Sequence, residues 1–186
     1  HSNPALSSAH LAQAYAMMAR VYHTYQFEEA ALACYLNLDR IQPGIYPCHY
    51  AIGWIYHSQG RFDLALRHLA EAKKIAEALE DTPPSVRVAM DCLIGDASLK
   101  LEKPPEAMKA FQEAARLDPQ CAYAWHGMGL AHSIQDNSRA AIECLERAIK
   151  LQPYASAGRV ILAREYRSAG LAESAAAVLP ALDNQR

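Results

Sequence analysis

Several patterns that mark common functional classes are missing from this sequence of 186 residues. It contains no CxxC pair, no HExxH motif and no GxSxG motif, and its eight glycines do not form a phosphate-binding loop. No apolar run approaches the roughly 20 residues that a membrane-spanning helix needs, and no basic-then-apolar signal peptide is found. These absences argue against a metalloprotease, a serine hydrolase, a nucleotide-binding enzyme and an integral membrane protein.

The sequence also has no large excess of positive or negative charge. The formal net charge is −2, and basic residues are interspersed with acidic ones, as in Glu71-Ala72-Lys73-Lys74. Such mixed charge is typical of solvated helix faces. Nucleic-acid binding needs a concentrated basic surface. We therefore predict no nucleic-acid partner.

The cysteines fit poorly with a disulfide framework, because their number is odd. The simplest interpretation is that they are small buried hydrophobic residues in a reducing compartment. This favours the cytoplasm and leaves a periplasmic protein with unpaired thiols as an alternative. The five residues are Cys34, Cys48, Cys92, Cys121 and Cys144.

What the sequence does contain is a pattern that recurs every 34 residues. Residues 122–155 show it best, since two helical apolar patterns flank the turn at 135–138 and end at Pro153. Small residues, Gly129 and Ala141, occur where two helices would cross, and the bulkier Leu145 follows. Shifting back by one period gives equivalent residues in the same register: Gly95, Ala107, Phe111, Ala114 and Pro119.

This pattern resembles the tetratricopeptide repeat family over residues 12–186. The resemblance implies an all-α, right-handed α-solenoid of antiparallel helix pairs in a single domain. Residues 1–11 are expected to form an N-terminal extension that includes tag remnants, since the chain starts at His1 without a methionine. The predicted repeats are 12–45, 46–79, 88–121, 122–155 and a partial repeat at 156–186.

One insertion breaks the register. Residues 80–87 are additional to the repeat, and helical periodicity continues through residues 67–79 without the usual proline. We predict that the second helix of this repeat is about two turns longer than normal. A loop at 80–87 should follow, with Ser85 capping an extended next helix. The extension is either a rim that contacts a partner or a tolerated elongation of the surface.

The resemblance places ligands in a concave groove lined by the first helix of each repeat. Tyr50 and Trp54 are one helical turn apart, so their rings should share a face and could anchor a peptide. The alternative for Trp54 is packing against the neighbouring helix. The predicted partner-binding residues are Arg20, Tyr50, Trp54, His57, Asp96, His126, Arg164 and Arg167.

The eight histidines do not suggest a metal site or a catalytic base. His126 and His132 are six residues apart, whereas two imidazoles on one helical face need a separation of four. We predict no catalytic residue, no metal and no cofactor.

The sequence therefore predicts a non-enzymatic scaffold that binds a peptide segment or a partner helix within a larger assembly. Its helical segments are similar in style to bacterial members that scaffold envelope or secretion assemblies. No polar capping helix closes the array, so we expect either that the chain continues beyond Arg186 or that another subunit covers the terminal face. Two alternatives remain: a structural module that forms homo-oligomers through uncapped ends, and an accessory domain of a larger enzyme.

Overall fold

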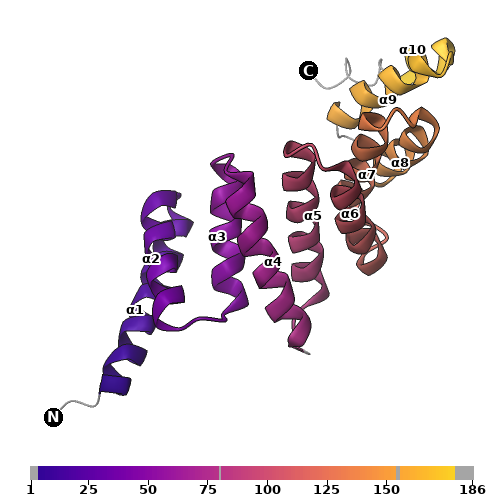
Figure 1. The fold of residues 1–186 in the computed structure, drawn as a ribbon. Coiled ribbons are helices and arrows are strands. Elements are labelled where there is room, and N and C mark those ends of the chain that lie inside the picture. Colours follow the sequence, from indigo (N-terminus) through magenta and orange to yellow (C-terminus); the bar gives the residue numbers. More distant parts are fainter. Residues whose placement is uncertain (1–3, 80, 154–155, 179–186) are drawn as a thin grey trace. The chain divides into compact units, whose positions relative to one another are not determined.

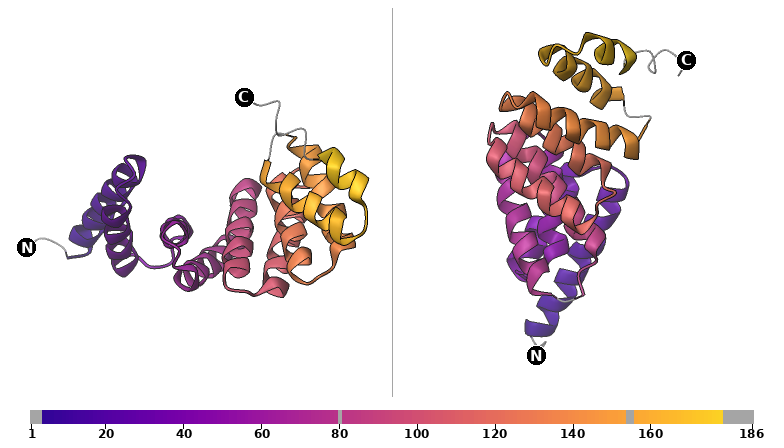
Figure 2. Two further views of the ribbon diagram at one scale, coloured as in Figure 1. Left: turned by 90° about the horizontal axis from the view of Figure 1, so that it is seen from above. Right: turned by 90° about the vertical axis from the view of Figure 1, so that its right-hand side faces the viewer.

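The computed structural model describes residues 4–79, 81–153 and 156–178, and its ten helices confirm the predicted all-α solenoid (Figure 1). Successive helices pack as pairs, and the pairs can be followed from two further directions in Figure 2. The helices are α1 (Pro4–Thr24), α2 (Glu28–Ile41), α3 (Tyr46–Ser58), α4 (Phe62–Ala78), α5 (Pro84–Lys100), α6 (Pro104–Leu117), α7 (Ala122–Ile134), α8 (Ser138–Leu151), α9 (Ser156–Ser168) and α10 (Ala172–Val178).

The chain divides into two compact units. The first unit is His1–Thr82 and holds α1 to α4, and the second is Pro83–Arg186 and holds α5 to α10. In the first unit α2 also packs against α3. In the second, α6 packs against α7 and α8 against α9, while α7 contacts both α5 and α9. Residues 179–186 of the predicted fifth repeat lie outside the described residues.

Small residues at the helix crossings have the predicted effect on packing. A Cβ atom added to Gly53 of α3 would lie 2.7 Å from Cγ of Leu69 on α4. The same substitution at Gly129 of α7 would bring Cβ to 2.6 Å from Cγ of Leu145 on α8. Both leucines are fully buried. Each pair can approach closely only because one helix contributes no side chain at the crossing.

The turns inside the repeats share one backbone conformation. Each contains a residue with positive φ, between 55° and 78°, which only glycine adopts without steric cost. The positions follow the 34-residue period, shifted by eight after the insertion: Gln26, Gly60, Glu102, Asp136 and Gly170. The repeat is therefore preserved in the backbone of its turns even where the glycine is not.

The junction between α4 and α5 differs from the predicted one. α4 has 17 residues against 14 in α2, α6 and α8, so it is longer by about one turn rather than two. α5 is extended as predicted, also to 17 residues, but it begins at Pro84 and Ser85 lies inside it. Proline suits the first helical position because its missing amide hydrogen would have no partner there. Thr82, rather than Ser85, makes the polar contact here, donating from its buried hydroxyl to the Ala76 carbonyl at 3.0 Å.

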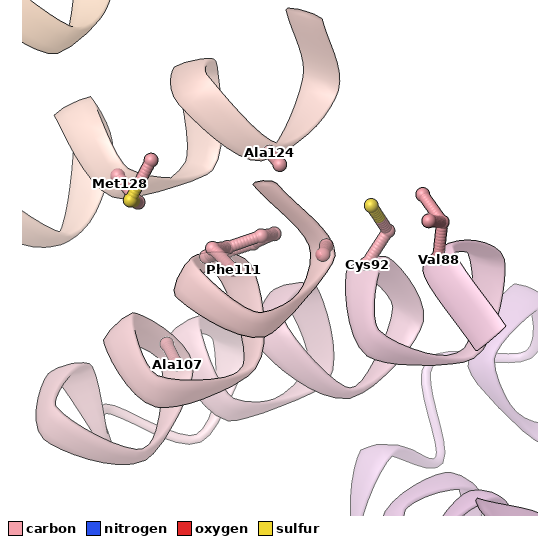
Figure 3. Packing of buried hydrophobic residues seen from close by; sticks show 7 residues of the cluster. Val88, Cys92, Ala107, Phe111, Ala124 and Met128 are labelled. Carbon is pink, nitrogen blue, oxygen red and sulfur yellow. The ribbon is translucent and has the colours of Figure 1, made fainter. Parts of the chain in front are cut away.

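The core of the second unit is built around one aromatic ring. Phe111 projects from α6 and is 1% exposed. Figure 3 shows it among side chains of α5, α6 and α7: Val88, Cys92, Ala107, Ala124 and Met128. Ala114 of α6 belongs to the same cluster. A Cβ atom on Gly95 of α5 would lie 2.6 Å from the ring, and one on Gly127 of α7 would overlap it as well. The ring therefore occupies space that two glycines leave open.

Candidate functional site

Tyr50 and Trp54 lie along one cavity of the first unit, on the same side of α3. The cavity has a volume of about 430 Å³ and is also lined by His23 of α1 and Tyr35 of α2. Trp54 is 37% exposed. Its ring packs edge-on against His23, with ring centroids 4.9 Å apart and an interplanar angle of 68°. Trp54 thus touches the neighbouring helix and still presents ring surface to solvent.

His57 and Arg20 do not line this cavity. His57 packs edge-on against Phe62 at the start of α4, with ring centroids 5.4 Å apart. Arg20 is exposed on α1 and borders two other depressions. One of them, of about 290 Å³, is lined by residues of α1, α2 and the start of α3, including Tyr35 and Cys48. Of the four predicted residues in the first unit, the structure therefore brings together Tyr50 and Trp54.

Asp96 and His126 belong to a second cluster, in the second unit, which also includes Tyr123. The Tyr123 hydroxyl donates to the Asp96 carboxylate. Partial burial, the Asp96 charge and this hydrogen bond raise the pKa of Tyr123 to about 12. Burial lowers the pKa of His126, while the Asp96 charge acts in the opposite direction.

Tyr123 and His126 line a cavity of about 180 Å³ that is otherwise mostly apolar. Its other walls come from α8 and α9, and Gly158 leaves room beside the imidazole, since a Cβ there would lie 3.4 Å from His126 Cδ2. The His126 Nε2 atom is buried without a hydrogen-bond partner. Tyr123 was not among the predicted binding residues, although it lies three residues before His126 and so on the same face of α7.

Arg164 and Arg167 are exposed on α9, but Arg164 is bound within the repeat. Its guanidinium donates to the Ser133 hydroxyl at 2.6 Å and to the Glu165 carboxylate at 3.2 Å. Arg167 lies in the last turn of α9. These contacts use only part of the five N–H donors of the guanidinium, so Arg164 can contact an acidic partner while it keeps them.

Glu165 is the centre of a polar network that the sequence did not reveal. Its carboxylate is buried and accepts hydrogen bonds of 2.8 Å from Ser133 on α7 and from Ser138 on α8. Burial alone would raise the pKa of Glu165, but the hydrogen bonds from the two serines and from Arg164 lower it below its ordinary value. Asn137, rather than Ser138, makes the capping bond of α8.

A second network of polar side chains joins α2, α3 and α4 in the first unit. His49 Nε2 lies 3.2 Å from the Asp39 carboxylate, and His49 Nδ1 lies 3.3 Å from His68 Nδ1. Burial and the neighbouring His49 lower the pKa of His68. One of the two facing nitrogen atoms must donate and the other accept, so the accepting imidazole carries no proton at Nδ1. A spacing of four residues indicates a histidine pair only within one helix, and this contact joins α3 to α4 across 19 residues.

Across 4–79, 81–153 and 156–178, no three histidine, cysteine or acidic side chains lie close enough together to hold a metal ion. No helix in these ranges combines the length and the apolar character that crossing a membrane requires.

Comparison with known proteins identifies the repeat. The family model described as "Tetratricopeptide repeat" matches residues 46–79, 92–121 and 122–154, which together make up just over half of the chain. Interferon-induced protein with tetratricopeptide repeats 2 of Mus musculus is 29% identical over 161 residues. That match covers 79% of this chain and 34% of the mouse protein, so the chain spans about a third of its relative's length.

Solved structures give the same fold. The structure of MamA superposes with a TM-score of 0.81 at 18% identity, covering 93% of this chain and 90% of MamA. YrrB, described as "a TPR protein with an unusual peptide-binding site", superposes with a TM-score of 0.75 at 19% identity, covering 92% of this chain and 84% of YrrB. At these identities the likeness concerns the fold alone.

Proposed function

Because the chain belongs to the tetratricopeptide repeat family, whose members are interaction modules, we propose that this protein-interaction scaffold binds a peptide segment through the cavity beside Tyr50 and Trp54. The observation that carries the proposal is the exposure of Trp54, 37% of whose surface remains open although His23 holds its ring in place. Partly exposed aromatic rings in a preformed concavity are the usual anchors of protein interfaces. The proposed role requires no catalytic group, metal or cofactor.

The chemistry of the cavity defines the expected ligand. Three aromatic rings and one imidazole line it, so it suits an apolar or aromatic anchor side chain. Arg20 lies on the same helix as His23, one turn before it, and is exposed. A carboxylate next to the anchor in the peptide could therefore add a charge-assisted contact. YrrB, with its printed peptide-binding site, provides a precedent on the same fold.

Replacing Trp54 by alanine is expected to weaken peptide binding by roughly 30-fold, since hot-spot aromatic residues contribute about 2 kcal/mol or more. Peptides selected on the wild-type protein from a displayed random library provide the ligands, and fluorescence anisotropy measures their affinity. Tyr25→Ala is the matched control, because Tyr25 directly follows α1, is 70% exposed and does not line the cavity.

The melting temperature separates binding from folding in this experiment. The Trp54 variant should melt within a few degrees of wild type, as partly exposed side chains contribute little to stability. A large fall in melting temperature with no change in peptide affinity would identify Trp54 as a packing residue and contradict the proposal.

A second candidate function is self-assembly through the face of α1. Apolar side chains there are unusually exposed, with Met17 at 62% and Val21 at 54%. An exposed apolar face of this kind often marks a protein contact. This observation supports the structural alternative, in which copies of the chain associate through the first helix.

Val21→Lys is expected to abolish self-association if that alternative is correct. Sedimentation velocity over a hundredfold concentration range should show wild-type protein shifting toward a dimer and the variant remaining a monomer. Trp54→Ala serves as the control and should dimerise like wild type. A wild-type protein that is a monomer at every concentration eliminates the self-assembly function.

A further inference from the structure

Two of the five cysteine thiols contact each other between helices of the second unit. Cys92 lies in the middle of α5, and Cys121 is the residue that precedes α7. Their Sγ atoms are 3.8 Å apart, although 29 residues separate them in sequence. Figure 3 shows the Cys92 sulfur on the side of α5 that faces α7. The intervening segment contains the whole of α6.

The surroundings of the pair favour uncharged sulfur. Cys92 is 8% exposed and belongs to the apolar cluster around Phe111, whereas Cys121 is half-buried at its edge. Burial, followed by the neighbouring Cys121, raises the pKa of the Cys92 thiol well above its ordinary range. A disulfide carries no charge and is compatible with this cluster.

We propose that Cys92 and Cys121 are a redox modification site, which forms an intramolecular disulfide by exchange with a low-molecular-weight disulfide such as oxidised glutathione. Bond formation requires the sulfur atoms to move from 3.8 Å to about 2.05 Å apart. Cys121 precedes the helix, with φ −69° and ψ 92°, so its side chain is not limited to the rotamers that a helical backbone allows.

The reaction has two exchange steps. The more accessible Cys121 loses its proton and attacks the glutathione disulfide, forming a mixed disulfide and releasing one reduced glutathione. Cys92 then loses its proton and attacks the Cys121 sulfur, which expels the second glutathione. The two protein thiols are oxidised by two electrons, and the glutathione disulfide is reduced to two thiols.

The second step should be slow at neutral pH and faster at higher pH. Only the thiolate attacks, and the raised pKa of Cys92 keeps its thiolate scarce. The mixed disulfide on Cys121 is therefore expected as a transient species that disappears more quickly as pH rises.

The remaining cysteines do not share this arrangement. Cys48 donates its thiol hydrogen to the Tyr35 carbonyl at 3.2 Å, and burial raises its pKa to about 12. Cys34 is buried in α2. Cys144 packs against the same apolar cluster as Cys92 and is half-buried like Cys121. It is therefore the matched control.

The folded protein is incubated with oxidised glutathione, alkylated, and analysed by peptide mapping and intact mass. Free thiols measured after denaturation should fall from five to three, with Cys92 and Cys121 in one cross-linked peptide pair and two hydrogen atoms lost. A reductant should reverse the change. Closing the loop should raise the melting temperature of the second unit by about 5 °C or more.

Serine variants of single cysteines test whether the reaction belongs to Cys92 and Cys121. Cys121→Ser and Cys92→Ser should each prevent the cross-link, and Cys92→Ser should retain a stable glutathione adduct on Cys121. Cys144→Ser should cross-link like wild type. Retention of all five thiols, a wild-type adduct that never closes, or a cross-link to another cysteine would each overturn the proposal. Cys121 is the less buried of the two, so its variant remains informative if Cys92→Ser is poorly folded.

Discussion

Replacing Phe111 by alanine is expected to lower the free energy of unfolding of the second unit by about 3 to 5 kcal/mol, the usual cost of removing a buried aromatic ring. The ring is 1% exposed and contacts three helices. Gly95 and Gly127 border it on two sides and have no side chains that could move into the space. The cavity left by the substitution should therefore stay open, which places the expected loss in the upper part of the range.

Urea denaturation followed by Trp125 fluorescence measures this effect. Trp125 lies in the second unit, and a Trp54→Phe background removes the only other tryptophan. Ile134→Ala is the control, because it shortens a large apolar side chain of the same unit at a position that is 54% exposed. Equal losses for the two variants would show that Phe111 is not the centre of the core.

The two glycines provide an independent check on the same packing. In an ordinary helix, Gly→Ala stabilises by about 1 kcal/mol. At Gly127 the new Cβ would overlap the Phe111 ring, so Gly127→Ala should destabilise instead. The double variant Gly127→Ala/Phe111→Leu should recover part of the free energy of unfolding that Gly127→Ala loses, because the smaller leucine leaves room for the new Cβ.

Glu165→Ala is expected to cost about 2 to 4 kcal/mol, because it leaves two serine hydroxyls in a partly buried site without their acceptor. These hydroxyls belong to Ser133 and Ser138, from two other helices. Glu143→Ala is the control, since this carboxylate is exposed and its i,i+4 ion pair of 3.6 Å with Arg139 is on the surface. The control should change the free energy of unfolding by about 0.5 kcal/mol or less.

The same residue predicts a pH dependence. The pKa of Glu165 is lower in the folded chain than its ordinary value of 4.5, so the folded state favours the carboxylate. Its contribution to stability is complete above that ordinary value and is lost as pH falls through the folded pKa. Urea denaturation at pH 7, 5, 4 and 3 should show a steeper acid loss for wild type than for Glu165→Gln. Parallel curves would mean that Glu165 is not held as a carboxylate.

The fold could be predicted from sequence because its determinants repeat along the chain. Gly53 with Leu69 and Gly129 with Leu145 are equivalent pairs at one spacing, and each encodes the same close crossing. The end of α4 and the start of α5 could not be placed as well. The insertion occurs once and has no second copy to compare with. Prolines there permit a helix start at Pro84 as readily as a loop.

The candidate site was predictable where one helix determines it. Tyr50 and Trp54 share a face because they are four residues apart on α3, and the structure places both rings along one cavity. His57 is only three residues beyond Trp54. Its ring nevertheless packs against Phe62 of α4 and does not line the cavity.

Contacts between distant helices were not predictable in the same way. Glu165 meets serines 27 and 32 residues earlier in the sequence, and His49 meets His68 across 19 residues. Such contacts depend on the rotation and offset of packed helices, which a single sequence with a regular repeat does not specify.

The arrangement of Gly95, Phe111 and Gly127 also restricts how this sequence can diverge. A larger residue at either glycine is incompatible with the phenylalanine, and a smaller residue at position 111 leaves a void. Acceptable changes must therefore be coordinated, with the ring reduced before or together with the enlargement of a glycine. Related chains should show correlated substitution at these three positions, and the repeat that contains Phe111 should not be exchangeable with its neighbours one repeat at a time.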